Sequence, residues 1–114
     1  LALPGQKGFW SIGFARRGDG GTEVFCWSRP EGFADPSAAV RATARRDEKN
    51  RRTLYEALLP FAALGMTREI AGTGFRFNLI VNDNDGKLRE GYLAAAPGMG
   101  IGEDPSLWKV LQLE

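Results

Sequence analysis

The strongest constraint on the fold is the strict alternation of side chains at positions 75–81. The apolar positions are Phe75, Phe77, Leu79 and Val81, and the positions between them are Arg76, Asn78 and Ile80. A period of two is typical of a β-strand with one buried face, because successive side chains point to opposite sides of a sheet. We therefore expect the four apolar side chains to be buried and Arg76 and Asn78 to be exposed.

Two further pairs of segments read as β-hairpins. Residues 10–16 alternate in the same way, and residues 22–28 resume the alternation after the turn sequence GDGG. A second hairpin is expected from residues 40–45 and 54–59, which alternate in the same way on either side of a charged turn. Helix competes for residues 38–46, because Ala and Arg are good helix formers, but pairing with the later segment favours strand.

The remaining segments carry turn and cap signals. Residues 29–37 have loop composition, and FAAL before Gly65 predicts one helical turn with a glycine C-cap. Asp104 can cap the turn that begins at Pro105, and strands are expected at residues 89–95 and 108–113. About six or seven short strands separated by turns predict an all-β protein, an antiparallel β-sandwich of the jelly-roll or immunoglobulin-like type.

Size and composition restrict the classes of function. A chain of 114 residues is expected to form a single domain, residues 1–114. Its net charge of +1 provides no field that would recruit nucleic acid. Cys26 is the only cysteine, which excludes an intrachain disulfide, and no apolar stretch is long enough for membrane insertion.

Catalytic and metal-binding patterns were sought among the polar residues. The chain has no His, and Glu56, Glu90 and Asp104 lack a partner at acid–base spacing, so we expect no enzyme, no catalytic residues and no cofactor. The acidic turn at residues 82–86 offers oxygen ligands for calcium, but its side chains are more typical of a hairpin turn. We expect no metal site there.

The only basic cluster lies in the second predicted hairpin. It consists of Arg45, Arg46, Arg51 and Arg52, with Asp47 and Glu48 between them. No aromatic side chains interleave with these arginines to stack on bases. We therefore interpret the cluster as a solvated hairpin turn rather than a phosphate site.

Three tryptophans are candidates for sugar recognition, which needs flat aromatic faces and planar polar groups. Trp10, Trp27 and Trp108 are each more often core residues than binding platforms, and this applies most to Trp108 and least to Trp27. Arg76 and Asn78 are polar groups on the predicted exposed face. Trp27, Arg76 and Asn78 are therefore the candidate carbohydrate-binding residues.

The second half of the chain contains a specific series of motifs. NLIVNDNDG, REGYL, a Gly-rich turn and DPSLW follow one another, and YEALLPFAALG precedes them. In this order and spacing the chain resembles the C-terminal portion of carbohydrate-binding module family 9-like domains. The resemblance implies a non-catalytic β-sandwich of a multimodular secreted bacterial protein, located in the extracellular space or the periplasm. Its implied partners are a polysaccharide or oligosaccharide and an attached catalytic domain.

The chain also departs from this family. Gly102 occupies the place of the family's loop tryptophan, and family positions that contact sugar correspond to Ser11 and Ile80, with Asn78 retained. The family's domains open with further strands that have no counterpart here, so we expect a sandwich that lacks its N-terminal strands. These departures leave open an alternative function as a structural or protein-interaction β-sandwich module whose sugar site has decayed.

Overall fold

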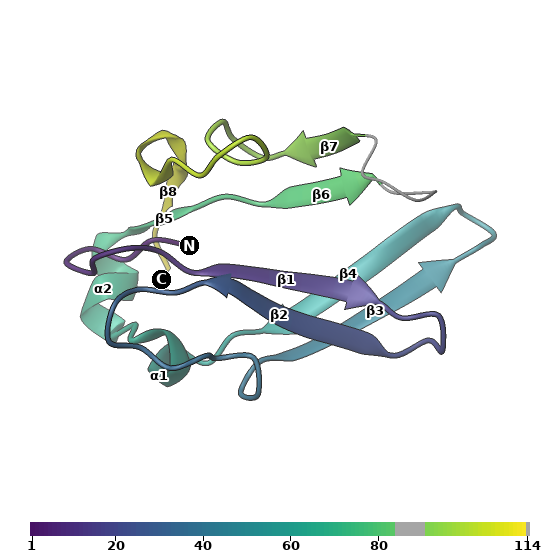
Figure 1. Cartoon of the computed structure of the whole chain (residues 1–114), viewed down its shortest axis with the longest axis horizontal. Helices are drawn as coiled ribbons and strands as arrows, with labels where there is room; N and C mark the ends of the chain where they lie inside the picture. Colours follow the sequence, from purple (N-terminus) through teal and green to yellow (C-terminus); the bar gives the residue numbers. More distant parts are fainter. Residues whose placement is uncertain (84–90, 114) are drawn as a thin grey trace. The chain divides into compact units, whose positions relative to one another are not determined.

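The computed structural model describes residues 1–83 and 91–113 and is mainly β with a few helical residues (Figure 1). The chain forms two compact units. The double-hairpin unit comprises Lys7–Thr67, and the split unit comprises Leu1–Gln6 together with Arg68–Glu114. Each unit is described separately below.

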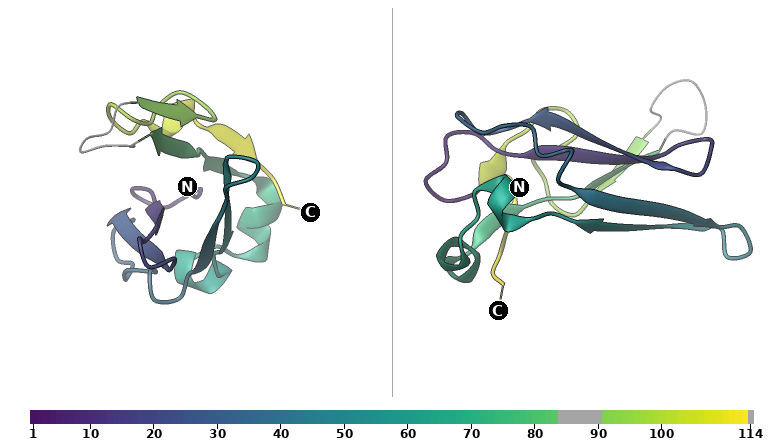
Figure 2. Two further views of the ribbon diagram at one scale, coloured as in Figure 1. Left: turned by 90° about the vertical axis from the view of Figure 1, so that its right-hand side faces the viewer. Right: turned by 90° about the horizontal axis from the view of Figure 1, so that it is seen from below.

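The double-hairpin unit contains both hairpins expected from the sequence. The first joins β1 (Ser11–Arg16) to β2 (Thr22–Ser28), and the second joins β3 (Arg41–Asp47) to β4 (Arg52–Leu58). Both are antiparallel, and β3 is a strand rather than the competing helix. The hairpins lie side by side (Figures 1 and 2). The backbone N–H of Ala44, on β3, donates to the Thr22 hydroxyl, on β2, at 2.9 Å.

The core of this unit forms where the second hairpin returns to the start of the first. Trp10 is 1% exposed, and its indole N–H donates to the carbonyl of Leu64 at 3.1 Å. Leu64 ends the single turn α1 (Phe61–Leu64), whose C-cap Gly65 has the left-handed φ of 66° that glycine adopts at no steric cost. The predicted helical turn and its glycine cap are confirmed. Phe33, from the long loop, packs its ring edge against Trp10 with centroids 5.5 Å apart.

The split unit is built from shorter elements. They are α2 (Arg68–Thr73), β5 (Phe75–Phe77), β6 (Ile80–Asp83), β7 (Gly91–Ala94), the 3-10 turn η1 (Pro105–Leu107) and β8 (Lys109–Leu111). β5 pairs with β8 and β6 pairs with β7, both antiparallel. α2 was not predicted from the sequence. This helix is short and contains Gly72, which weakens its signal in the sequence. Its residue Ala71 is buried, and the Ala71 carbonyl accepts a hydrogen bond from the Leu113 N–H at 3.0 Å.

The prediction of one continuous strand over residues 75–81 is wrong in part. The strand breaks between β5 and β6, and the side-chain parity changes at the break. Phe75 is buried as expected and Arg76 is exposed, but Asn78 is only 7% exposed, whereas Leu79 and Val81 are each 52% exposed. Asn78 lies at the break, and its side chain bonds to the Ala96 carbonyl and N–H, which the β6–β7 ladder would use if it continued to residue 78.

Each sheet among residues 1–83 and 91–113 has two strands. Two apolar surfaces are therefore left open to solvent, one on β4 and one on the β6–β7 pair, where Leu93 is 77% exposed. Antiparallel pairing and the predominance of strands agree with the expected all-β class. No helix within the described ranges has the length and apolar character needed to cross a membrane.

Candidate carbohydrate-binding surface

Trp27 lies at a β-bulge near the end of β2. Cys26 pairs with Ile12 and Ser28 pairs with Ser11, so Trp27 is the extra residue with no partner on β1. A bulge re-aims the side chain that it carries, and bulges are common beside binding sites. The Trp27 side chain is 65% exposed, in contrast to Trp10 and Trp108, which are 1% and 3% exposed. The prediction that Trp27 is the least buried of the three tryptophans is confirmed, whereas Trp10 rather than Trp108 is the most buried.

The Trp27 indole is supported from below and from one side. A Cβ added at Gly13, on the neighbouring strand, would lie only 2.6 Å from Cζ3 of the indole, so the ring rests directly on the backbone of β1. The Phe25 ring stacks against the indole with centroids 5.8 Å apart and an interplanar angle of 16°. Gly13 and Phe25 face each other across the hairpin. Together they hold the indole as a fixed, flat, outward-facing surface, which we call the Trp27 platform.

Gly13 and Phe25 were not among the residues singled out from the sequence. A signal for them exists, because a glycine in the middle of an alternating strand marks a place where something approaches the backbone closely. Here the segment opposite carries two aromatic residues at positions i and i+2, Phe25 and Trp27. An aromatic side chain that covers a strand glycine is a known way to stabilise a sheet.

Polar groups lie next to the platform. An open hollow is lined by Cys26, Trp27, Ser28 and Arg29. The Cys26 thiol donates to the carbonyl of Ser28 at 3.3 Å, and burial raises the pKa of this thiol above its ordinary value, so it is neutral at pH 7 and a poor nucleophile. Ser28 and Arg29 provide the other polar side chains that line this hollow.

Arg76 is exposed, but its guanidinium already has bonding partners. Nη1 donates to the carbonyl of Ser106 at 2.8 Å and to that of Trp108 at 3.4 Å. These carbonyls lie at the end of η1, so Arg76 ties β5 to this turn. Its other guanidinium nitrogens leave donors for a ligand. Its predicted contact with sugar stays a prediction.

Asn78 is buried, which corrects the exposed position expected for it. Its Oδ1 accepts from the backbone N–H groups of Leu79 and Ala96, each at 2.9 Å. Its Nδ2 donates to the carbonyls of Ala96 and Pro97 at 2.9 and 3.0 Å. A primary amide has two donor hydrogens and two acceptor lone pairs, so this side chain is fully occupied. A sugar hydroxyl would have to displace one of these bonds.

The loop after β7 is closed by its own side chains. Asp104 caps η1 as predicted, accepting from the Ser106 N–H at 3.0 Å and from its hydroxyl at 2.6 Å, and these bonds hold the pKa of Asp104 below its usual 3.8. The Trp108 indole N–H donates to the Gly98 carbonyl at 2.7 Å. Gly102, at the place of the family's loop tryptophan, has a φ of 123° and open space around it.

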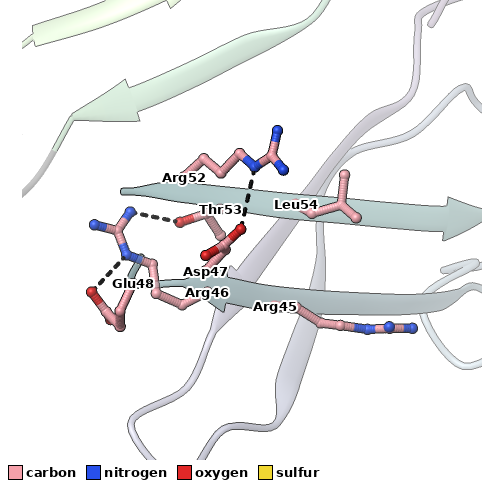
Figure 3. Close-up of a pocket in the computed structure, with 7 residues that line it drawn as sticks. All are labelled: Arg45, Arg46, Asp47, Glu48, Arg52, Thr53 and Leu54. Atoms are coloured by element: carbon pink, nitrogen blue, oxygen red, sulfur yellow. Dashed lines mark hydrogen bonds and ion pairs between the residues drawn. The ribbon is translucent and has the colours of Figure 1, made fainter. Parts of the chain in front are cut away.

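The basic cluster occupies the tip of the β3–β4 hairpin, where it lines a hollow (Figure 3). Figure 3 shows two of its arginines, Arg46 and Arg52, bonded within the hairpin, and Arg45 lies 3.6 Å from Glu56 of β4. Arg52 Nε lies 3.5 Å from Asp47, Arg46 Nε lies 3.4 Å from Glu48, and Arg46 Nη1 donates to the Thr53 hydroxyl at 3.3 Å. The interpretation as a hairpin turn is confirmed. Local carboxylates compete there with any phosphate for the arginines.

The acidic turn predicted at residues 82–86 falls mostly outside the described residues, which end at Asp83 and resume at Gly91. The strands on either side pair antiparallel, with Asp83 opposite Gly91. Over residues 1–83 and 91–113 no three His, Cys, Asp or Glu side chains gather closely enough to hold a metal ion.

No family model, no curated protein and no solved structure matches the chain.

Proposed function

We propose that this chain is a non-catalytic carbohydrate-binding module, an antiparallel β-sandwich in its complete form, that binds a polysaccharide or oligosaccharide on the Trp27 platform. The observation that carries the proposal is the outward indole of Trp27, 65% exposed yet fixed by Gly13 and Phe25. A large apolar ring costs free energy when it is left in water. An indole that is held in place by Gly13 and Phe25 and yet remains exposed indicates that its free face binds a ligand.

A pyranose fits this surface chemically. Its C–H face is apolar and flat enough to stack on an indole, and its hydroxyls need donors and acceptors at the rim. Ser28 and Arg29 supply such groups beside the ring. The Trp27 indole N–H is also available, since it has no hydrogen-bond partner within the described part of the chain. A platform fixed before binding loses little conformational entropy when the ligand arrives.

Arg76 and Asn78 enter the proposal in a different role from that of Trp27. Both belong to the split unit, where they bond to the backbone of the segment 96–108. We propose that they fix this loop, and that Arg76 keeps donors on its other guanidinium nitrogens for a ligand that binds the split unit. Following the family resemblance, we also propose that the module is exported to the extracellular space or periplasm and directs an attached catalytic domain to its substrate.

The proposal is tested by titrating the chain with mono- and oligosaccharides, including cellulose and xylan fragments, while the indole N–H resonances are followed by NMR. We expect a dissociation constant near millimolar, because one stacked aromatic face contributes only a few kcal/mol, close to the roughly −4.1 kcal/mol of a millimolar complex. Trp27→Ala should abolish the shifts. Phe61→Ala is the matched control, since Phe61 is also an exposed aromatic residue (43%) of the same unit.

Binding that survives Trp27→Ala unchanged would exclude the platform as the site. Absence of binding to every sugar in the panel would reject the carbohydrate-binding function. A dissociation constant well below millimolar that depends on Trp27 would support the function and show that further groups contribute to the affinity.

A second candidate function, a protein-interaction module, is favoured by one specific surface. Leu79, Val81 and Leu93 share one face of the β6–β7 pair and are 52%, 52% and 77% exposed. Clusters of exposed apolar side chains mark interaction surfaces. Hydrogen exchange of β6–β7 amides distinguishes the candidates: protection that increases when the chain is joined to its neighbouring domain supports interaction, whereas an unchanged rate rejects it.

A further inference from the structure

The outer edge of β4 is open for pairing with another strand. β4 pairs with β3 from Arg52 to Leu58, and across residues 1–83 and 91–113 no second strand pairs with it. All seven of its residues are exposed, including Leu54 at 57%, Tyr55 at 47% and Leu58 at 61%. An edge strand presents a row of backbone N–H and C=O groups that can bind a further strand. Sequences that avoid such pairing place prolines, bulges or charged side chains there. β4 has no proline and no bulge, and its two charged residues, Arg52 and Glu56, are of opposite sign.

The side chains of β4 are complementary to those of a second copy. In an antiparallel pairing of two β4 strands centred on Leu54, Arg52 lies opposite Glu56 of the partner subunit. Thr53 then lies opposite the partner's Tyr55, and the two Leu54 side chains face each other. Opposite charges, an aromatic beside a β-branched residue, and two apolar residues are the cross-strand pairs that stabilise antiparallel sheets. The segment RTLYE is thus self-complementary when it is read against itself.

We propose that the chain forms a symmetric dimer by antiparallel addition of β4 to β4 in this register. The two-fold axis passes through Leu54, so every contact is made twice. Arg52 then lies between Asp47 of its own hairpin, at 3.5 Å, and the partner's Glu56. Figure 3 shows Arg52 and Leu54 on β4, with Arg52 directed toward Asp47. Pairing joins two two-stranded sheets into one of four strands, which is more stable than an isolated hairpin.

The charged pairs provide the test. Arg52→Glu makes both ends of the segment acidic and Glu56→Arg makes both ends basic, so either change alone replaces two attractive pairs by two repulsive ones. We expect each single variant to raise the dimer dissociation constant about thirtyfold, equivalent to about 2 kcal/mol. An equimolar mixture of the two variants should restore association, since the acidic and basic strands complement each other. The double variant Arg52→Glu/Glu56→Arg should also dimerise.

Sedimentation equilibrium over a range of concentrations measures the association, against a monomer mass of 12.5 kDa. Circular dichroism verifies that each variant folds, and the double variant carries both local changes, so it controls for damage to the hairpin. Leu93→Ser, on β7, should leave the dimer unchanged. A native chain that stays monomeric overturns the proposal, and so does association that survives both single reversals or is not restored in the mixture.

Discussion

Replacing Gly13 by Ala tests how the Trp27 platform is built. The added Cβ would lie 2.6 Å from Cζ3 of the indole and closer still to Cη2, so the ring has to retreat by roughly 1.5 Å to reach an ordinary carbon–carbon separation. The ring is exposed, and it can swing outward without moving the backbone. We therefore expect Gly13→Ala to displace the indole from the β1 backbone and from Phe25 while the hairpin remains folded.

The stability change is expected to be small because two terms oppose each other. Loss of the stacked pair of Phe25 and Trp27 costs about 0.5–1.5 kcal/mol. Alanine in a strand is more favourable than glycine by about 0.5–1 kcal/mol. The net change should stay below about 1 kcal/mol, a shift in Tm of less than about 5 °C. Sugar affinity, by contrast, should fall about tenfold, or about 1.4 kcal/mol.

Thermal unfolding and NMR measure the two effects separately. In the native chain we expect nuclear Overhauser effects between the indole ring protons and the Gly13 α-protons, and their loss in Gly13→Ala. The reasoning is refuted if the indole keeps its contacts in the variant, or if the variant loses several kcal/mol of stability. A displaced indole with unchanged sugar affinity would confirm the packing argument but contradict the platform as the binding site.

Three further predictions concern stability. Asn78→Ala leaves buried backbone groups, including the Ala96 N–H, without partners and should cost about 1–3 kcal/mol in urea unfolding; a neutral result contradicts the bonding role. Arg51→Gly should raise stability by about 1 kcal/mol, seen as a higher Tm, because Arg51 has a left-handed φ of 52°. Hydrogen bonds from Ser106 lower the pKa of Asp104 in the folded state below 3.8. The ionised carboxylate therefore stabilises the fold above pH 3.8, and this stabilisation is lost as the pH falls through the lowered pKa of the folded state. In Asp104→Ala the urea midpoint of unfolding should accordingly depend less on pH in the acid range.

The sequence predicted those elements whose signals are local. The two hairpins of the double-hairpin unit were predicted by alternation and turn composition, and α1 by the segment FAAL before Gly65. These signals act within a few residues, so no tertiary contact is needed to interpret them. The choice of strand over helix for β3 needed one further step, the pairing partner β4, and the structure confirms that choice.

The segment 75–81 shows where local patterns fail. Alternation alone cannot distinguish a continuous strand from two strands joined at a polar residue, because both give the same pattern until the break. The break depends on Asn78 bonding to Ala96 and Pro97, which are far away in sequence. In β5 the odd-numbered position Phe75 is buried, but after the break the odd-numbered positions Leu79 and Val81 are exposed. Similarly, α2 was not predicted, because the contacts of Ala71 are not local: it is buried, and its carbonyl accepts from the Leu113 N–H, far away in sequence.

The tryptophans show what separates a core residue from a binding platform. A buried indole needs a hydrogen-bond acceptor for its N–H, and Trp10 and Trp108 find theirs in the carbonyls of Leu64 and Gly98. Each acceptor lies in a turn that contains a glycine, Gly65 next to Leu64 in one case and Gly98 itself in the other. These turns come close to the indoles only in the folded chain. Trp27 has no such acceptor within the described residues, and a bulge turns its ring over Gly13 instead. An indole that is fixed by packing but keeps its N–H free is suited to a ligand that provides both an apolar face and an acceptor, as a pyranose does.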